Sequence, residues 1–230
     1  MKVDVLASGS DGNCYALYES DGLTLGKVIL LDCGISFGKT LDLINYKFPA
    51  AVLVTHEHGD HSFAAKKFLG RGVEVYMTAG TARALNLERH NLNLIKVGDK
   101  FTVEGFTITV LPSNHDANEP VNFIVEDADD RLLYVTDTRE VPYVTGKFTK
   151  ILIEANHRRR DVMLNPELPE SVKLRILNSH LNIDQTVEFL KANPAEEIWL
   201  IHVSKDNGNV QAFAREVSER TNAPAVNVPI

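Results

Sequence analysis

Three histidines, a glutamate and an aspartate stand close together in VTHEHGDHSF, residues 54–63. His56, His58, Asp60 and His61 carry the imidazole and carboxylate groups that bind divalent transition metals. The run AAVLVT just before them is short and apolar, as a buried strand is. The sequence therefore predicts a metal site at the end of a strand, in preference to a solvated loop that happens to be rich in histidine.

A zinc-protease helix is the first alternative, because His-Glu opens the stretch. That motif needs two histidines four residues apart on one helical face, and position 60 is Asp60. Residues two apart point in different directions on a helix, so His56 and His58 fit a strand end or a loop. Asp60 and His61 then lie in the turn that leads into the next helical pattern.

The arrangement His-x-His-x-Asp-His resembles the metal-binding signature of the metallo-β-lactamase superfamily. Further elements follow in the order of that superfamily: Asp32 in LLDCG, His115 in SNHDA, Asp137 in YVTDT and His202 in LIHVS, each after a strand-like segment. The resemblance implies an α/β fold, the four-layer αββα metallo-β-lactamase sandwich. It also implies that residues 1–230 form a single hydrolase domain.

The same resemblance implies a binuclear site. One metal would be held by His56, His58 and His115, and the other by Asp60, His61 and His202, with Asp137 bridging them. Imidazole and carboxylate ligands suit zinc or manganese, and iron as well. Two metals about 3.5–4 Å apart share a hydroxide and stabilise the attacking and leaving oxygens, and Asp60 is expected to serve this catalysis. Asp32 is expected either to accept the second N–H of a ligand imidazole or to cap its strand.

A narrower resemblance is to the YycJ (WalJ/VicX) branch of the superfamily. It rests on SGSDGN at 8–13, HDANEP at 115–120, EANH at 154–157, SHLN at 179–182 and HVSKDN at 202–207. The chain departs from the branch at Ser179, where a glycine is usual, and after His180. It also departs in NHRRRD, where three arginines precede Asp161. These departures leave the metal set intact and concern the substrate edge.

His180 lies outside the seven ligand positions, in the polar SHLN turn. In phosphodiesterase branches a histidine in this region contacts the phosphate or protonates the leaving oxygen, and the resemblance implies that catalytic role here. Histidine suits it because its pKa lies near neutral pH; a surface or capping histidine is the alternative. Glu154 is expected to orient His180, with His157 nearby.

These features together predict a metal-dependent phosphodiesterase, foremost a nuclease and by resemblance a 5′ exonuclease on DNA. The first alternative is a phosphodiesterase of cyclic nucleotides or other small molecules, which an acidic chain suits because a small ligand needs no extended basic surface. An ester or thioester hydrolase and a non-catalytic metal-binding protein rank below it. The expected partner is a nucleic acid or nucleotide.

Composition agrees with a soluble globular protein. The 230 residues carry a formal net charge of -7, with 44% hydrophobic and 24% charged residues. The start MKVDVLAS lacks a basic-then-apolar signal segment and no apolar run reaches membrane-spanning length, so we expect a cytoplasmic protein without a membrane partner. Cys14 and Cys33 are expected in the core. The patterns leave the native metal, DNA against RNA, the mode of attack and the oligomeric state open.

Short strands with helices between and after them must position these residues. Strands are predicted at 3–7, 14–18, 27–32, 50–55, 73–77, 92–97, 106–111, 121–126, 131–136, 150–155 and 197–203. Helices are predicted at Gly38–Tyr46, His61–Leu69, Thr81–His90, Asp184–Ala192 and Val210–Arg220. Every predicted ligand then follows or adjoins a strand end, which is where sheets covered by helices place their functional loops.

Overall fold

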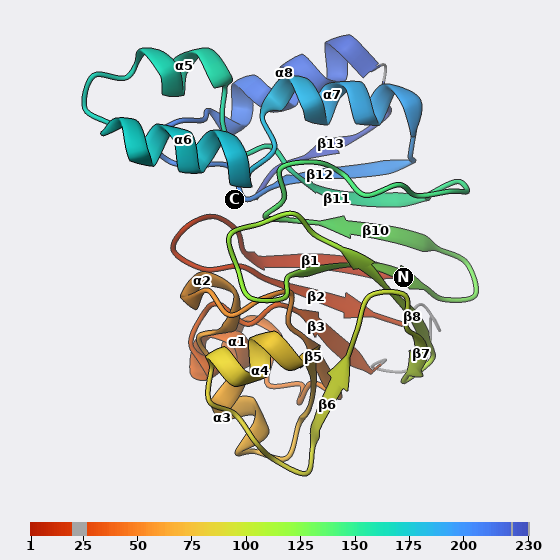
Figure 1. Ribbon diagram of the computed structural model, residues 1–230. Coiled ribbons are helices and arrows are strands. Elements are labelled where there is room, and N and C mark those ends of the chain that lie inside the picture. The colour runs from red at the N-terminus through yellow and green to blue at the C-terminus, as the bar shows by residue number, and fades with distance from the viewer. Residues whose placement is uncertain (20–26, 222, 230) are drawn as a thin grey trace. The chain divides into compact units, whose positions relative to one another are not determined.

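The computed structural model describes residues 1–19, 27–221 and 223–229 (Figure 1). The chain divides into two compact units. Unit 1 comprises residues 1–111, 117–121 and 125–129, and unit 2 comprises residues 112–116, 122–124 and 130–230. β9 (Val121–Glu126) contributes residues to both.

A six-stranded sheet forms the centre of unit 1. Its strands are β1 (Lys2–Ala7), β2 (Cys14–Tyr18), β3 (Val28–Leu31), β4 (Ala51–Leu53), β5 (Glu74–Thr78) and β6 (Leu92–Ile95), in that order across the sheet. The first two pairs are antiparallel, and β3 to β6 are parallel. β3 and β4 are fully buried, as their continuous apolar runs predict for parallel strands. Cys14 and Cys33 are buried in this core, as predicted.

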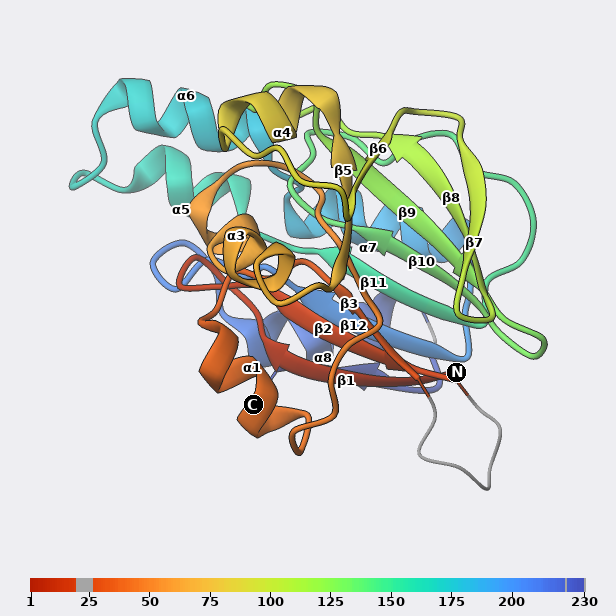
Figure 2. The ribbon, with the colours of Figure 1, turned by 90° about the horizontal axis from the view of Figure 1, so that it is seen from below.

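Helices pack on the sheet of unit 1 (Figure 2). They are α1 (Phe37–Leu43), α2 (Gly59–Ser62), α3 (Ala65–Leu69) and α4 (Ala79–Ala84). The helix predicted from His61 to Leu69 is thus two short helices that meet near Ala64. The helix predicted to reach His90 ends at Ala84, because Asn86 takes a left-handed φ of 51° that stops the helical path.

A β-hairpin completes the strands of unit 1. It joins β7 (Lys100–Val103) to β8 (Phe106–Pro112), which pair antiparallel. Its two turn residues, Glu104 and Gly105, both have positive φ, at 49° and 87°. That is the type I′ geometry, whose twist matches the twist of the flanking strands.

Unit 2 contains four parallel strands that lie side by side in the order β13-β12-β11-β10. They are β10 (Arg131–Val135), β11 (Lys150–Glu154), β12 (Glu197–Ile201) and β13 (Val226–Asn227). Register pairs Val135 with Ile153 and Glu154 with Ile201. Because neighbouring parallel strands end at the same edge, whatever follows β10, β11 and β12 is brought together there.

The helices of unit 2 are α5 (Arg159–Leu164), α6 (Glu170–Ser179), α7 (Ile183–Ala192) and α8 (Val210–Thr221). α7 and α8 cover one face of the parallel strands, and α5 and α6 form a hairpin (Figure 1). The sequence patterns predict α7 and α8 but not α5 or α6. Among the described residues, no helix has the length and apolar character needed to cross a bilayer.

Candidate functional site

The predicted ligand loop of unit 1 begins where β4 ends. His56 follows that strand after two residues, His58 stands at the N-cap of α2, and Asp60 and His61 lie within α2. The His56 ring centroid lies 4.7 Å from that of His58 and 4.3 Å from that of His61. The structure therefore brings these three imidazoles of unit 1 together.

The side chain of Asp32 stabilises this loop through hydrogen bonds. It is fully buried directly after β3, and its Oδ2 lies 2.7 Å from Nδ1 of His61. Its Oδ1 accepts hydrogen bonds from the backbone N–H of Thr55 at 2.8 Å and from the Thr55 hydroxyl at 3.0 Å. Asp32 thus contacts an imidazole and also accepts hydrogen bonds from the residue after the neighbouring strand, and its role beside a metal ligand stays a prediction. With Nδ1–H directed at this carboxylate, Nε2 of His61 is the nitrogen left to act as a ligand atom.

Asn13, for which the sequence predicts no role, forms hydrogen bonds with the same loop. Its backbone N–H donates to the carbonyl of Asp60 at 2.7 Å. Its side-chain Nδ2 lies 3.3 Å from Oδ2 of Asp60 and 3.1 Å from Nε2 of His61. The signal for it was present in SGSDGN, which carried the family resemblance but no assigned function.

Gly34 lies against this loop so closely that no side chain fits. A Cβ built on Gly34 would lie 1.7 Å from the backbone oxygen of Asp60. We expect Gly34→Ala to displace the loop, to lower the free energy of unfolding by about 1–3 kcal/mol or more, and to lower the metal content. Thermal unfolding followed by circular dichroism and elemental analysis of the purified protein measure the two effects.

Gly38→Ala is the matched control, because nothing lies within 4 Å of a Cβ built on Gly38. That variant should keep both stability and metal content. If Gly34→Ala behaved as Gly38→Ala does, the close approach of Gly34 to the Asp60 backbone would not matter for the loop.

Three of the predicted residues at strand ends have left-handed backbones. The φ angles are 58° for Asp32, 43° for Asp137 and 50° for His202. For residues with a side chain this region costs about 1–3 kcal/mol, and such residues concentrate at functional sites because the surrounding fold enforces them. The left-handed backbone at these positions therefore sets the direction in which the three side chains point.

The predicted residues of unit 2 gather at the carboxyl edge of its parallel strands. Nε2 of His115 lies 3.3 Å from Oδ2 of Asp137, and Nδ1 of His202 lies 3.1 Å from Oδ1 of Asp137. The carbonyl of Ser179 accepts the Nδ1–H of His115 at 2.9 Å. Burial lowers the pKa of His115, and the neighbouring charge of Asp137 opposes that effect. A neutral imidazole with Nδ1–H so engaged presents Nε2 toward Asp137.

Glu154 is the centre of this cluster. It is fully buried, and its Oε1 lies 2.6 Å from Nδ1 of His180 and 2.9 Å from Nδ1 of His202. Its Oε2 accepts the backbone N–H of Leu181 at 3.0 Å. Burial raises the pKa of Glu154, but the charge and hydrogen bond of His180 and the hydrogen bond of His202 together lower it to about 2. Glu154 therefore stays ionised and makes hydrogen bonds with two histidines, His180 and His202.

His180 is placed by the end of α6. Its ring centroid lies 5.1 Å from that of His115 and 5.5 Å from that of His202, with the latter pair stacked. Burial lowers the pKa of His180, but the Glu154 charge and hydrogen bond outweigh it, so the pKa is raised. Glu154 thus makes a hydrogen bond with His180, whereas its orienting role and the catalytic role of His180 stay predictions.

His157 lies next to this cluster but makes no hydrogen bond with it. It is fully buried, and within residues 1–19, 27–221 and 223–229 neither ring nitrogen has a hydrogen-bond partner. Burial lowers its pKa to about 4, with a further contribution from the charge of His180, while Glu154 opposes the change. His157 is therefore neutral at pH 7. Its backbone carbonyl accepts the N–H of Ile183 and so joins the end of β11 to α7.

Comparison with known proteins matches residues 27–203 to the model of a beta-lactamase superfamily domain. The exodeoxyribonuclease WalJ of Streptococcus pneumoniae is 29% identical, over 93% of this chain and 85% of that protein. The exodeoxyribonuclease YycJ of Bacillus anthracis is also 29% identical, over 92% of this chain and 85% of that protein.

Among solved structures, the metallo-β-lactamase fold protein YhfI from Bacillus subtilis superposes with a TM-score of 0.74. The match covers 99% of this chain and 95% of that one at 17% identity. A likeness at this identity concerns the fold alone. It confirms the predicted α/β sandwich of the metallo-β-lactamase type.

Proposed function

The chain belongs to the beta-lactamase superfamily, and from that premise we propose that it is a metal-dependent phosphodiesterase that acts as a nuclease on DNA. The resemblance to the YycJ branch is confirmed by relatives that align over more than nine-tenths of the chain. Those relatives bear the name exodeoxyribonuclease, which supports nucleic acid as the partner and removal of nucleotides from a strand end as the activity.

The donor groups within each unit suit divalent metal ions. Oδ2 of Asp60 and Nε2 of His61 lie 3.4 Å apart in unit 1, and Nε2 of His115 and Oδ2 of Asp137 lie 3.3 Å apart in unit 2. Two ligand atoms bound at about 2.1 Å to one tetrahedral metal are about 3.4 Å apart. Both pairs therefore have the spacing of neighbouring ligands.

We propose that the seven residues predicted from the sequence bind two metal ions. Their donor groups suit zinc or manganese, and iron as well. The set is His56, His58, Asp60, His61, His115, Asp137 and His202. When bound, such ions lower the pKa of water and neutralise the charge of a phosphodiester. The sharing of each ion among these residues stays a prediction, as does the single domain over residues 1–230.

The chain's own residues supply positioning and a proton. Asp32 orients His61, and Glu154 orients His202, as the carboxylate partners of ligand histidines do. Glu154 also keeps Nδ1 of His180 engaged, so that Nε2 of that ring is the position from which a proton reaches the leaving oxygen. The observation that carries the proposal is this one buried carboxylate, which binds both a proposed ligand and the proposed acid.

We also propose that the protein acts in the cytoplasm, as the sequence predicts.

A phosphodiesterase of cyclic nucleotides remains the second candidate, because the chain is acidic overall, with a net charge of -7. A polymer substrate would instead require a local group of cations.

A substrate panel tests the proposal. Manganese- or zinc-loaded protein should shorten 5′-labelled single- or double-stranded DNA, with slower or no turnover of RNA and of cyclic nucleotides. Gel electrophoresis of timed samples gives the products, and single nucleotides released from one end identify an exonuclease. Turnover of cyclic nucleotides alone would replace the nuclease by the second candidate, and no cleavage of any phosphodiester by metal-loaded protein would reject both.

A further inference from the structure

The arginine run Arg158–Arg160 takes no part in the proposed chemistry, yet it stands between two residues of the unit 2 cluster. It opens the α5–α6 hairpin, which leaves the sheet after His157 and returns at His180. Both ends of the hairpin therefore lie at the carboxyl edge of β11, where Glu154 holds His180.

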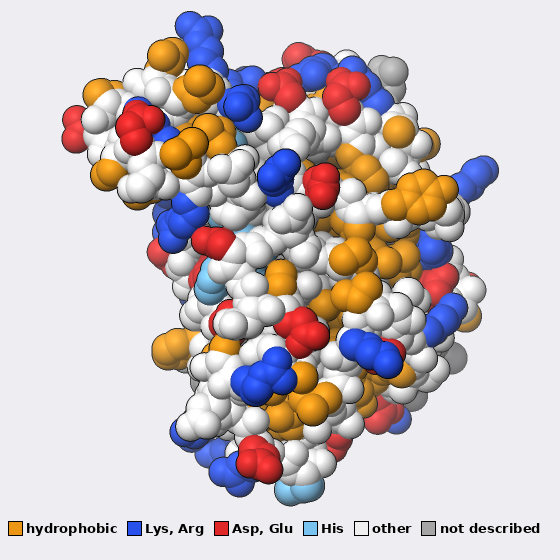
Figure 3. Space-filling view, viewed as in Figure 1, with side chains coloured by type: hydrophobic (Ala, Val, Ile, Leu, Met, Phe, Trp, Pro, Cys, Tyr) orange, Lys and Arg blue, Asp and Glu red, His pale blue; other side chains and the backbone are white. Residues whose placement is uncertain are grey.

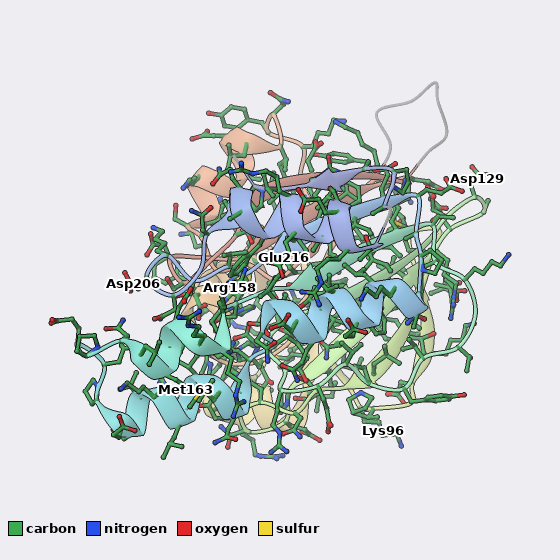
Figure 4. The ribbon with its side chains drawn as sticks, turned by 90° about the horizontal axis from the view of Figure 1, so that it is seen from above. Lys96, Asp129, Arg158, Met163, Asp206 and Glu216 are labelled. Atoms are coloured by element: carbon green, nitrogen blue, oxygen red, sulfur yellow. The ribbon has the colours of Figure 1, made fainter. Side chains whose placement is uncertain are left out.

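Arg158, the first arginine of the run, makes a structural contact with α8. Arg158 forms an ion pair with Glu216 of α8 (Figure 4). Its guanidinium also lies 5.4 Å from the centre of the Phe213 ring. Arg158 thus fastens the start of α5 to α8. This contact makes Arg158 unsuitable as a ligand for substrate and fixes the position from which the next two arginines extend.

Arg159, Arg160 and Arg175 are different, because all three are exposed. The part of the chain that the structure describes contains no ion-pair partner for any of them. Lys173, by contrast, is neutralised by Glu170 at 2.9 Å. The hairpin therefore carries three exposed arginines outside ion pairs, and they outnumber its two remaining carboxylates, Asp161 and Glu167.

These charges lie near the cluster. The charge of Arg159 contributes to lowering the pKa of His157, which also responds to Glu154 and His180. Arg175 precedes His180 by five residues along α6, which is a rise of about 7.5 Å at 1.5 Å per residue. Arg159 and Arg160 thus follow the hairpin end at His157, and Arg175 stands less than two turns before the hairpin end at His180.

The exposed surface of the hairpin also carries apolar side chains among the charged ones (Figure 3). Met163, Leu164 and Leu174 have 54%, 68% and 59% of their surface exposed. Cations beside apolar groups suit an unpaired strand, whose phosphates and bases are both accessible. They also suit an anionic membrane surface, but a membrane contact gives no reason for the cations to lie on the hairpin that ends at His180.

We propose that Arg159, Arg160 and Arg175 bind the phosphodiester backbone of a nucleic-acid strand and guide it to the unit 2 cluster. This inference rests on the proposed function and deepens it, because it names the residues that bind the strand outside the metal site. It also accounts for how a chain of net charge -7 binds a polyanion.

Equilibrium binding tests the inference without turnover. Fluorescence anisotropy of a 5′-fluorescein 20-nucleotide single-stranded DNA is measured in EDTA over a range of salt concentrations. Each lost phosphate contact on a single strand reduces the salt slope by about 0.7, so the double variant Arg159→Gln/Arg160→Gln should reduce it by about 1.4. At 0.1 M salt this corresponds to binding about 25-fold weaker. Arg175→Gln alone should reduce the slope by about 0.7.

The matched control is Lys147→Gln/Arg215→Gln, which removes two exposed cations from other parts of unit 2. Lys147 precedes β11, at the opposite end of that strand from Glu154. The control should bind DNA as the wild type does. If the control lost as much DNA affinity, net charge alone would explain the effect and the inference would be overturned. An unchanged salt slope in the arginine variants would also overturn it.

Catalysis separates this inference from the proposed function. The double variant should lose at least tenfold more kcat/KM on the DNA strand than on bis(p-nitrophenyl) phosphate. A wild type that binds DNA through these arginines but cleaves no phosphodiester would keep the inference and reject the function. A wild type that cleaves the small diester but binds no strand would do the reverse, and binding only to phosphatidylserine vesicles would assign the surface to a membrane.

Discussion

Asp60→Asn should lower kcat on DNA by about 10³-fold and should reduce the bound metal from two ions to one. The substitution keeps the volume of the side chain and removes the negative charge that a divalent ion needs. Several kcal/mol of transition-state stabilisation come from each ion in such sites, and each 1.36 kcal/mol is a factor of ten in rate. Elemental analysis gives the metal stoichiometry, and initial rates on labelled DNA give kcat.

The structure explains why this variant should fold. The backbone of Asp60, not its carboxylate, accepts the N–H of Asn13 at 2.7 Å, so the loop keeps its anchor. An asparagine oxygen also remains able to accept from the Asn13 side chain, which lies 3.3 Å from Oδ2. Circular dichroism and thermal unfolding should therefore match those of the wild type.

Glu57→Gln supplies the control for the same loop and the same loss of charge. Glu57 accepts the backbone N–H of Asn118 at 2.8 Å through Oε1, and no ligand role is proposed for it. It should retain two metals and most of the activity. Two bound metals and wild-type kcat in Asp60→Asn would remove Asp60 from the ligand set.

The sequence predicted the residues of the site better than the contacts that hold them. His56, His58, Asp60 and His61 could be predicted as ligands because they cluster directly after an apolar strand and because His56 and His58, two residues apart, do not share one helical face. Asn13 carried no such mark. Its contact with Asp60 joins residues 47 positions apart, and a pairing of that range appears only once the sheet has formed.

The prediction of helices and strands likewise succeeded where the local sequence pattern was strong and failed where position depends on packing. Strands with continuous apolar runs, such as β11 and β12, were predicted because burial on both faces leaves a strong sequence signal. α5 and α6 were missed, because Pro166 and Pro169 interrupt the segment and much of its apolar surface is exposed. Their positions depend on packing, including the ion pair of Arg158 with Glu216, which no local pattern predicts.

Loss of the His180 imidazole should reveal whether it donates a proton. His180→Ala should retain both metals, because His180 is outside the proposed ligand set, and should lower kcat on DNA by about 10²–10⁴-fold, the range of general acid catalysis. The loss should be much smaller on bis(p-nitrophenyl) phosphate. Its nitrophenolate leaves without being protonated, whereas the alkoxide leaving group of DNA requires a proton.

The comparison between the two substrates distinguishes a proton donor from a structural residue. If His180 only packed against His115 and His202, whose rings lie within 5.1 and 5.5 Å, its removal would disturb the cluster and slow both substrates equally. If it bound the phosphate, KM would rise on both. His90→Ala, the loss of an exposed histidine in unit 1, should change neither substrate. A selective fall in kcat on DNA, with metal content intact, follows only if the ring that Glu154 orients at 2.6 Å supplies the proton to the leaving oxygen.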